Sequence, residues 1–172
     1  MLFRSGLKGA TGSEPVIRTP QGEVRLSLSL PGLHNVLNAA AALATAMQMG
    51  VPAAEAAAAI SAEPAAFGRA ERVAVDGHDL LLLLAKNPAG ANENVRTLLL
   101  DDRDHDLLVA LNDRIADGRD VSWIWDVDWE PLLPRIRRVT ATGERAHDLA
   151  LRFRYAGLDP DRLHVQIGRA HV

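Results

Sequence analysis

The stretch DLLVALNDRIADGRDVSWIWDVDWEPLLPRIRRVTAT, residues 106–142, decides the fold of this chain. It opens with an apolar run at 106–111, which is typical of a fully buried strand. It ends with IRRVTAT at 136–142, which has the composition of a second strand. Strands alternate with helical patterns through this half of the chain. The alternation predicts an α/β fold with a doubly wound, mostly parallel sheet.

The remaining elements follow from periodicity, capping and turn residues. We expect a strand at 23–30, helices at 35–49, 53–62, 91–100 and 142–155, and a hairpin turning at Asp76-Gly77 within 71–84. The pattern changes near Arg69–Arg72, which we take as a domain boundary between residues 1–70 and 71–166. Residues 1–15 lack caps and periodicity and resemble a loop from inside a larger protein. The tail at 167–172, IGRAHV, matches a translated sequencing adapter, so we exclude it as artefactual.

The segment DVSWIWDVDWE at 120–130 holds all three tryptophans of the chain. Read with a period of two, it separates an apolar aromatic side from a side that carries acids and Ile124. This alternation predicts a strand, either an ordinary edge strand with one buried and one wet face or a strand whose aromatic side anchors an interface. Asp126 follows Trp125 near the expected strand end, where a carboxylate can orient a histidine.

Composition excludes several classes of function. The net charge of −3 without a basic stripe argues against nucleic acid as a partner. The absence of cysteine excludes disulfides and thiolate metal sites. Neither GxxxxGK[ST] nor GxGxxG occurs, so the chain holds no phosphate cradle of these types. Outside the excluded tail the histidines are scattered without ligand spacing, and we predict no metal held by side chains; these histidines are His34, His78, His105, His147 and His164.

Polar residues follow two expected strands, and ligands of open α/β sheets bind at such carboxyl ends. Lys86 comes directly after the apolar run at 80–85, which we expect to form a buried strand, and it lies near a helix start. A cation there can stabilise a phosphate or a developing anion, although a solvated turn lysine fits the spacing as well. Asn112 and Asp113 end the strand at 106–111, where an ordinary Asx-rich loop is the simpler interpretation.

Two stretches of the first half resemble the Mur ligases, ATP-dependent enzymes that form amide bonds in peptidoglycan synthesis. They are LPGLHNVLNAAAALATAMQMG at 30–50 and FGRAE at 67–71. The resemblance implies that Asn35, Asn38 and Arg69 bind the nucleotide and that Lys86 occupies a lysine position of the C-terminal domain. The family often has an aspartate two residues before that lysine. Leu84 stands there instead, which argues against an ordinary amino-acid-adding Mur ligase.

Further motifs narrow the resemblance to the MurT family, the Mur-ligase-like subunits of lipid II isoglutaminyl synthase. The motifs are GRAERV at 68–73, KNPAGANE at 86–93, the segment at 111–130 and ERAHDLALRFRYAGL at 144–158. The similarity covers about residues 16–166 and is most specific in the tryptophan segment. It implies a Rossmann-like C-terminal domain preceded by the last strand and helices of the Mur central domain.

The resemblance also implies a reaction on the cytoplasmic face of the membrane. ATP, with Mg, activates the α-carboxyl of D-glutamate in lipid II as an acyl phosphate, and ammonia then displaces phosphate. The ammonia comes from a GatD-type glutaminase partner whose catalytic triad lacks its third member. Asp126 would complete that triad, with Asp120 and Asp128 as alternatives. The family's P-loop and four-cysteine zinc ribbon would lie before Met1, so we expect this chain to be inactive alone.

Two other functions remain open at this point. The chain can be a docking module that binds a partner through the tryptophans and carries out no chemistry. In that case the tryptophans are required and Asp126 is dispensable. It can also be the C-terminal part of another Mur-type ligase, such as a relative of folylpolyglutamate synthetase, which would need no glutaminase.

Overall fold

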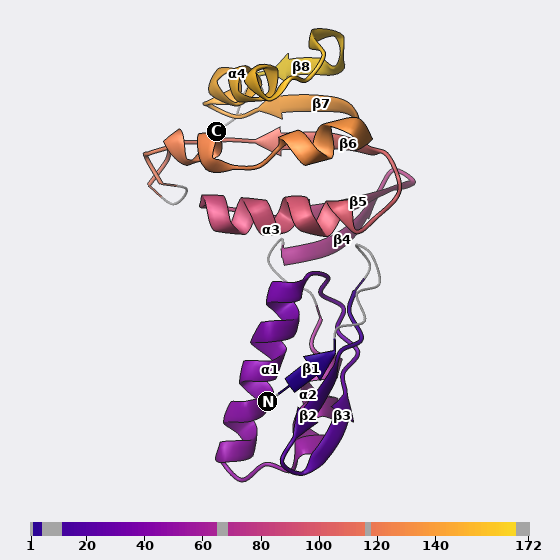
Figure 1. Ribbon diagram of the computed structural model, residues 1–172. Helices are drawn as coiled ribbons and strands as arrows, with labels where there is room; N and C mark the ends of the chain where they lie inside the picture. The colour runs from indigo at the N-terminus through magenta and orange to yellow at the C-terminus, as the bar shows by residue number, and fades with distance from the viewer. Residues whose placement is uncertain (1, 5–11, 65–68, 116–117, 168–172) are drawn as a thin grey trace. The chain divides into compact units, whose positions relative to one another are not determined.

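The computed structural model describes residues 2–4, 12–64, 69–115 and 118–167 (Figure 1). The chain divides into two compact units. The first unit comprises Met1–Leu84 and Arg96–Asp101, and the second comprises Ala85–Val95 and Asp102–Val172. The predicted boundary near residue 70 stays a prediction, as does the artefactual tail.

The first unit combines an antiparallel sheet with two helices and a hairpin. Its three-stranded sheet has the order β1-β2-β3, and the hairpin pairs β4 with β5. Ile17, Val36 and Leu43 are fully buried in its core. The elements are β1 (Leu2–Arg4), β2 (Val16–Thr19), β3 (Gly22–Arg25), α1 (Leu33–Gln48), α2 (Ala53–Ala62), β4 (Arg69–Val75) and β5 (His78–Leu83).

The helices of this unit have the predicted bounds to within two residues, because their alanine-rich patterns are long and end at Gly50 and after Ala62. The predicted strand at 23–30 is shorter, since β3 ends at Arg25 and Leu28 only forms an isolated bridge with Ser13. The sequence patterns miss β1 and β2, which are short.

The apolar strand before Lys86 is not buried, contrary to our expectation. β5 pairs with β4 alone among the described strands, and its residues are exposed or partly exposed. Leu80 and Leu82 keep 43% and 42% of their surface. A hairpin with a single neighbouring strand leaves much of its surface uncovered, whatever its composition.

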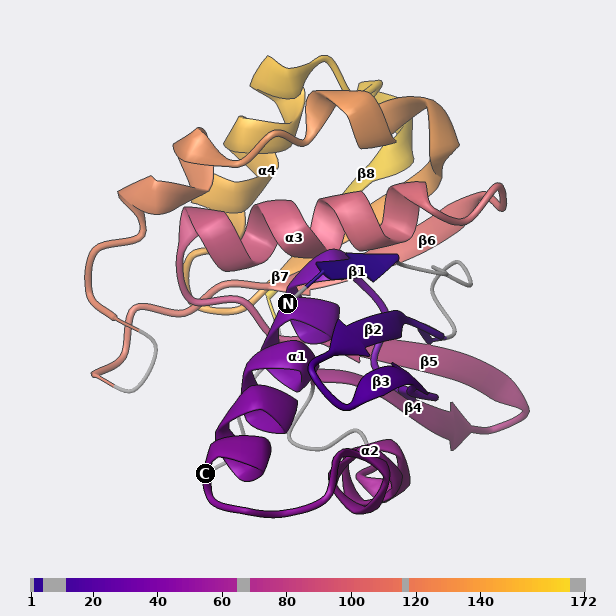
Figure 2. The same cartoon turned by 60° about the horizontal axis from the view of Figure 1, so that its bottom comes forward.

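The second unit is built on a parallel sheet with the order β6-β7-β8. Its helix α4 packs against β7 and β8, as both views show (Figures 1 and 2). Val139, Ala141 and Phe153 are fully buried. The elements are β6 (His105–Ala110), η2 (Ser122–Asp126), η3 (Glu130–Arg135), β7 (Ile136–Thr142), α4 (Ala146–Ala156), η4 (Pro160–Arg162) and β8 (Leu163–Gln166). The helix α3 (Pro88–Leu99) starts in this unit.

The predicted parallel α/β arrangement is confirmed in this unit. The strands predicted at 106–111 and 136–142 match β6 and β7 closely in position. The expected full burial of the first strand is wrong, because β6 lies at an edge of this sheet among the described strands and Leu108 keeps 73% of its surface exposed. The order β6-β7-β8 follows the chain, so each parallel pair is joined by a crossover. Such crossovers are right-handed in nearly all proteins.

Candidate functional site

The tryptophan segment is the crossover from β6 to β7, and the strand predicted at 120–130 is wrong. The segment forms the 3₁₀ helices η2 and η3. Val121, Ile124 and Val127 are buried, with 7%, 2% and 1% of their surfaces exposed. They recur at every third position, which is the period of a 3₁₀ helix. The signal lay in Ile124, the apolar residue that an alternating pattern places among the acids.

The tryptophans do not form a single wall. Trp129 packs on the buried Phe153, with ring centroids 4.8 Å apart. Trp125 is 45% exposed and meets Tyr155 edge to face at 5.5 Å. Tyr155 is itself 75% exposed. The crossover therefore packs the ring of Trp129 against the core and presents Trp125 to solvent beside Tyr155 of α4.

Two side chains hold the backbone of the crossover just after η2. The amide of Asn92 on α3 donates to the Asp126 carbonyl at 3.2 Å and accepts from the Asp128 N–H at 2.7 Å. Arg152 on α4 donates to the Val127 carbonyl at 2.7 Å. Three successive residues of the crossover are thus fixed from two different helices.

Arg152 is the most buried cation of this region, with only 5% of its surface exposed. Its guanidinium pairs with Glu130 at 2.8 Å and lies 5.8 Å from the ring centroid of Trp125. A buried charge needs such partners, because desolvation without them is costly. Arg152 stands on the apolar stripe of α4, between Leu149 and Phe153, and a charge at such a position was the signal that could have revealed it.

The three candidate carboxylates differ in their surroundings, although all are exposed. Asp120 accepts the N–H of Ser122 at 2.8 Å. Hydrogen bonds from the hydroxyl and backbone of Ser122 hold the pKa of Asp120 below its usual range. Within the described residues, the carboxylates of Asp126 and Asp128 have no hydrogen-bond or ion-pair partner. Asp126 thus combines a fixed backbone with an unengaged carboxylate.

The carboxyl ends of β6 and β7 are joined by a tight set of backbone bonds. The Leu111 N–H donates to the Thr142 carbonyl, and the Arg145 N–H donates to the Leu111 carbonyl, both at 3.0 Å. Gly143 has a φ of 93°, and a Cβ there would lie 2.4 Å from the Leu111 oxygen. Only glycine fits this approach. Asn112 accepts the Glu144 N–H at 3.1 Å, so it closes the loop at the sheet edge.

Arg145 organises the charges at this edge. Its guanidinium pairs with Asp148 at 2.7 Å and with Asp113 at 3.1 Å. The hydrogen bond from Arg145 holds the pKa of Asp148 below its usual range, and the two carboxylates raise the pKa of Arg145. Asp113 therefore has a defined ion pair, where the sequence suggested an ordinary loop.

A shallow pocket of about 260 Å³ lies between this edge and the crossover. Trp125 and the paired Arg145 and Asp148 are among the residues that line it. Its position at the carboxyl ends of parallel strands is where open α/β sheets bind ligands. The lining residues are Arg119, Asp120, Val121, Ser122, Ile124, Trp125, Arg145 and Asp148.

Lys86 is exposed in the connection between β5 and α3. The next residue, Asn87, caps α3, because its side chain accepts the Gly90 N–H at 2.8 Å. The positive end of the helix therefore lies beside the lysine. Both features favour an anion near this turn.

The predicted nucleotide residues lie in the first unit. Asn35 and Asn38 are three positions apart on α1, so they share one side of the helix. Asn38 is exposed, whereas the Asn35 amide donates to the Pro31 carbonyl at 2.7 Å. Arg69 is the first residue of β4, and the register shifts between Arg69 and Glu71. Ala70, within this irregularity, has a left-handed φ of 59°, and such bulges often lie near functional sites.

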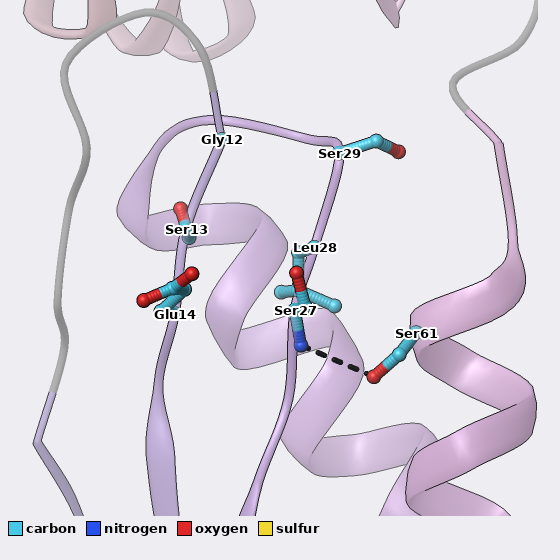
Figure 3. Close-up of a pocket in the computed structure, with 7 residues that line it drawn as sticks. All are labelled: Gly12, Ser13, Glu14, Ser27, Leu28, Ser29 and Ser61. Carbon is cyan, nitrogen blue, oxygen red and sulfur yellow. Dashed lines mark hydrogen bonds between the residues drawn. The ribbon is translucent and has the colours of Figure 1, made fainter.

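The first unit also has a pocket of its own, of about 290 Å³ (Figure 3). Its lining is rich in serine. The Ser61 hydroxyl oxygen accepts the Ser27 N–H at 3.1 Å, the bond drawn in Figure 3. The buried hydroxyl of Ser13 has no partner in the described structure. None of the predicted site residues lines this pocket, whose walls are Gly12, Ser13, Glu14, Ser27, Leu28, Ser29 and Ser61.

Two kinds of feature are absent from the part of the chain that the structure describes. There, no three His, Asp or Glu side chains gather as a metal site requires. No helix in that part is both long and apolar enough to cross a bilayer.

Comparison of the sequence with known proteins gives matches of one kind. Residues 84–171 match the model of the MurT ligase C-terminal family. The chain is 34% identical over 137 residues to the MurT subunit of lipid II isoglutaminyl synthase (glutamine-hydrolyzing) of Streptococcus pneumoniae R6, covering 79% of this chain and 31% of that protein. The subunit of the same name from Staphylococcus aureus COL is 37% identical over 93 residues, covering 54% and 21%. The chain thus spans less than a third of these curated relatives.

Solved structures of Mur-type ligases share the fold. MurF from Acinetobacter baumannii matches with a TM-score of 0.72 at 24% identity, covering 94% of this chain and 35% of that one. A folylpolyglutamate synthase from Mycobacterium tuberculosis, complexed with ADP, matches with a TM-score of 0.71 at 23% identity, covering 96% and 38%. These likenesses confirm the predicted Rossmann-like α/β fold of a Mur ligase. Together with the family match, they show that the chain belongs to the MurT ligase C-terminal family.

Proposed function

We propose that this chain is part of the ligase subunit that amidates the α-carboxyl of D-glutamate in lipid II to D-isoglutamine. The proposal rests on membership of the MurT family and on the names of the relatives, which describe a glutamine-hydrolysing lipid II isoglutaminyl synthase. The single structural observation that carries it is Asp126, an exposed and unengaged carboxylate on a backbone that two helices hold in place.

The reaction has two steps. A carboxylate oxygen of the substrate attacks the γ-phosphorus of ATP, which forms an acyl phosphate and releases ADP. Ammonia then adds to the carbonyl carbon, phosphate leaves, and the amide loses a proton to solvent or a base. We propose that Lys86 stabilises the negative charge that develops on the phosphoryl and carboxyl oxygens; its nearness to the capped start of α3 supports this role.

The described residues fit a nucleotide only in part. Asn38 presents an exposed amide on α1, while Asn35 already donates to the Pro31 carbonyl and keeps its own oxygen as an acceptor. No group of three acidic or histidine side chains among the described residues forms a site for Mg. We propose that Asn35, Asn38 and Arg69 contact the nucleotide, as the family resemblance implies. We assign no residue of this chain to the metal.

Ammonia would come from a GatD-type glutaminase subunit that contributes a cysteine nucleophile and a histidine base. We propose that Asp126 accepts the hydrogen bond of that histidine. A carboxylate in this place selects the tautomer and stabilises the imidazolium that forms during attack. Both subunits would work at the cytoplasmic face of the membrane on the lipid-linked substrate. Asp120 is a weaker candidate, because its carboxylate is already engaged with Ser122.

The test is a pair of rates for the full-length subunit reconstituted with its glutaminase. One rate is amidation driven by glutamine, and the other is amidation driven by added ammonia. Asp126→Asn should lower the glutamine-driven rate by about 10⁴-fold, the loss seen when such an orienting carboxylate is replaced. The ammonia-driven rate should stay unchanged, because the ligase chemistry does not use Asp126. Asp128→Asn, two residues away, is the matched control and should leave both rates unchanged.

Three results would contradict this function. If both rates fall together in Asp126→Asn, the residue belongs to the ligase site or to folding. If only Asp120→Asn or Asp128→Asn separates the rates, another carboxylate serves the partner. If no aspartate variant changes either rate, while Trp125→Ala abolishes complex formation, the chain acts as a docking module.

A further inference from the structure

The segment that carries Asp126 has little regular backbone structure to hold it. The 3₁₀ helix η2 ends at Asp126, and Val127 has extended dihedral angles, with φ −92° and ψ 129°. The next 3₁₀ helix begins only at Glu130. The connection between them therefore depends on side chains from elsewhere for its orientation.

Among the described residues, Asn92 supplies two of the three side-chain bonds to this connection. Its amide nitrogen donates to the Asp126 carbonyl, and its amide oxygen accepts from the Asp128 N–H, at 3.2 and 2.7 Å. One planar amide thus bridges residues 126 and 128. Because the donor and the acceptor belong to one rigid group, they set the direction of the chain as well as its position.

Arg152 supplies the third bond, to the Val127 carbonyl between these two residues. Its charge is paired with Glu130. Asn92, in contrast, is neutral and its residue is only partly buried. Its replacement therefore leaves no buried charge unpaired and adds none near Asp126. Of the two, Asn92 is the residue whose loss reports on orientation with the least effect on folding.

We propose that Asn92 is a positioning residue for Asp126: its side-chain amide fixes the backbone on both sides of Val127 and so directs the Asp126 carboxylate toward the partner's histidine. This inference rests on the proposed function of Asp126. This role requires no contact between Asn92 and the substrate or the partner. Its effect on glutamine hydrolysis passes through the crossover backbone, where Arg152 holds the intervening Val127 from the other helix.

The experiment uses the full-length subunit in complex with its glutaminase and compares Asn92→Ala with Asp126→Asn. Asn92→Ala should lower the kcat of glutamine-driven amidation by about 10- to 100-fold, since a misplacement of about 1 Å can cost 10²-fold. The KM for glutamine should not change, because glutamine binds to the partner. The ammonia-driven rate should also stay unchanged, which shows that the variant is folded. Asn94→Ala is the matched control, two positions and about 200° further around α3.

The outcomes separate this inference from the proposed function. A loss of glutamine-driven rate in both Asp126→Asn and Asn92→Ala, with ammonia-driven rates intact, supports both. A loss in Asp126→Asn alone overturns the positioning role and leaves the function of Asp126 standing. Equal loss of both rates in Asn92→Ala also overturns it, since that pattern indicates a general structural role. If Asp126→Asn has no effect, the proposed function fails, and with it the role assigned to Asn92.

Discussion

The helix α1 and the crossover between β6 and β7 are held in place by different interactions. In α1, Val36, Ala39 and Leu43 recur on one side and are buried in the core of the first unit. The helix supplies its own backbone hydrogen bonds, and burial of that side attaches it. In the crossover, buried residues recur at every third position, but side chains of Asn92 and Arg152 complete the backbone bonds.

This difference indicates which kind of segment can hold an exposed functional side chain in a fixed direction. A helix whose polar backbone groups are internally paired needs only apolar neighbours, so its position depends on how its buried side chains pack. A 3₁₀ crossover leaves carbonyls and N–H groups that distant side chains must satisfy. Each such bond fixes the direction of the backbone at that point. It thereby also fixes the direction in which a neighbouring exposed acidic side chain leaves the backbone. The crossover is therefore the better support for a carboxylate that has to meet a partner.

The largest effect should come from the buried residue that distinguishes a 3₁₀ segment from a strand. Ile124→Ala should destabilise the chain by about 2–4 kcal/mol, because it removes a side chain that is 2% exposed. Leu43→Ala in α1, at a core position, should destabilise the chain by a similar amount, about 2–4 kcal/mol. Urea unfolding measures both. Ser122→Ala, at an exposed position of the same 3₁₀ helix, should change stability by less than about 0.5 kcal/mol. A loss at Ser122 and none at Ile124 would contradict the three-residue period.

The next effect should come from the bonds that α4 makes to the crossover. Arg152→Met keeps the aliphatic volume but removes the donor to the Val127 carbonyl and the pairing with Glu130. The unsatisfied carbonyl should cost about 1–3 kcal/mol in unfolding free energy. The emission of Trp125 should also change, since the guanidinium lies near its ring.

Arg154→Met, at an exposed position two residues along α4, is the control for this variant. It should leave both the unfolding free energy and the tryptophan emission near those of the unaltered chain. Equal losses from Arg152→Met and Arg154→Met would mean that general charge, and not the bond to the crossover, stabilises this helix.

The smallest effect concerns acid stability at the edge of the parallel sheet. Arg145 lowers the pKa of Asp148 in the folded state, so the pair stabilises the fold above the unfolded carboxylate pKa of about 3.9. That stability is lost as the pH falls through the lower folded pKa. Asp148→Asn should lower the Tm at pH 7 by less than about 3 °C, because both side chains are partly exposed. The difference from the unaltered chain should shrink below pH 4.

A Tm difference that stays constant from pH 7 to pH 3 would show that Asp148 acts through packing instead of charge. Asp161→Asn provides the comparison, since its carboxylate is exposed and has no partner among the described residues. Its Tm should follow that of the unaltered chain over the whole pH range.

Much of the fold could be predicted because several elements are long and strongly patterned. The helix at 35–49, the hairpin at Asp76-Gly77 and the strands at 106–111 and 136–142 all occur close to their expected places. Strands of three or four residues, such as β1 and β8, carry too little pattern to be recognised. Their existence depends on neighbours that are distant in sequence, with which they share hydrogen bonds.

Less of the candidate site could be predicted. Asp126 could be named from its motif, and whether it serves the partner stays a prediction. The environment of Asp126 could not be named, because Asn92 and Arg152 lie 34 and 25 residues away from their bonding partners in the crossover. Arg145 was missed as well, since its pairing with Asp113 arises only when the ends of β6 and β7 meet. Sequence spacing describes local periodicity, and these contacts are long-range.

The backbone of the 3₁₀ crossover should open to solvent on a shorter timescale than that of the parallel sheet. Its few backbone bonds include those from Ile124 to Val121 and from Leu132 to Trp129, while the Asp128 N–H depends on a side chain. Amide protons bound in this way exchange with solvent through small local fluctuations, whereas those of β7, in the middle of its sheet, need wider unfolding. Hydrogen–deuterium exchange should therefore label the crossover earlier than β7. A bound partner that covers Trp125 and Tyr155 would slow exchange first in the segment that carries Asp126.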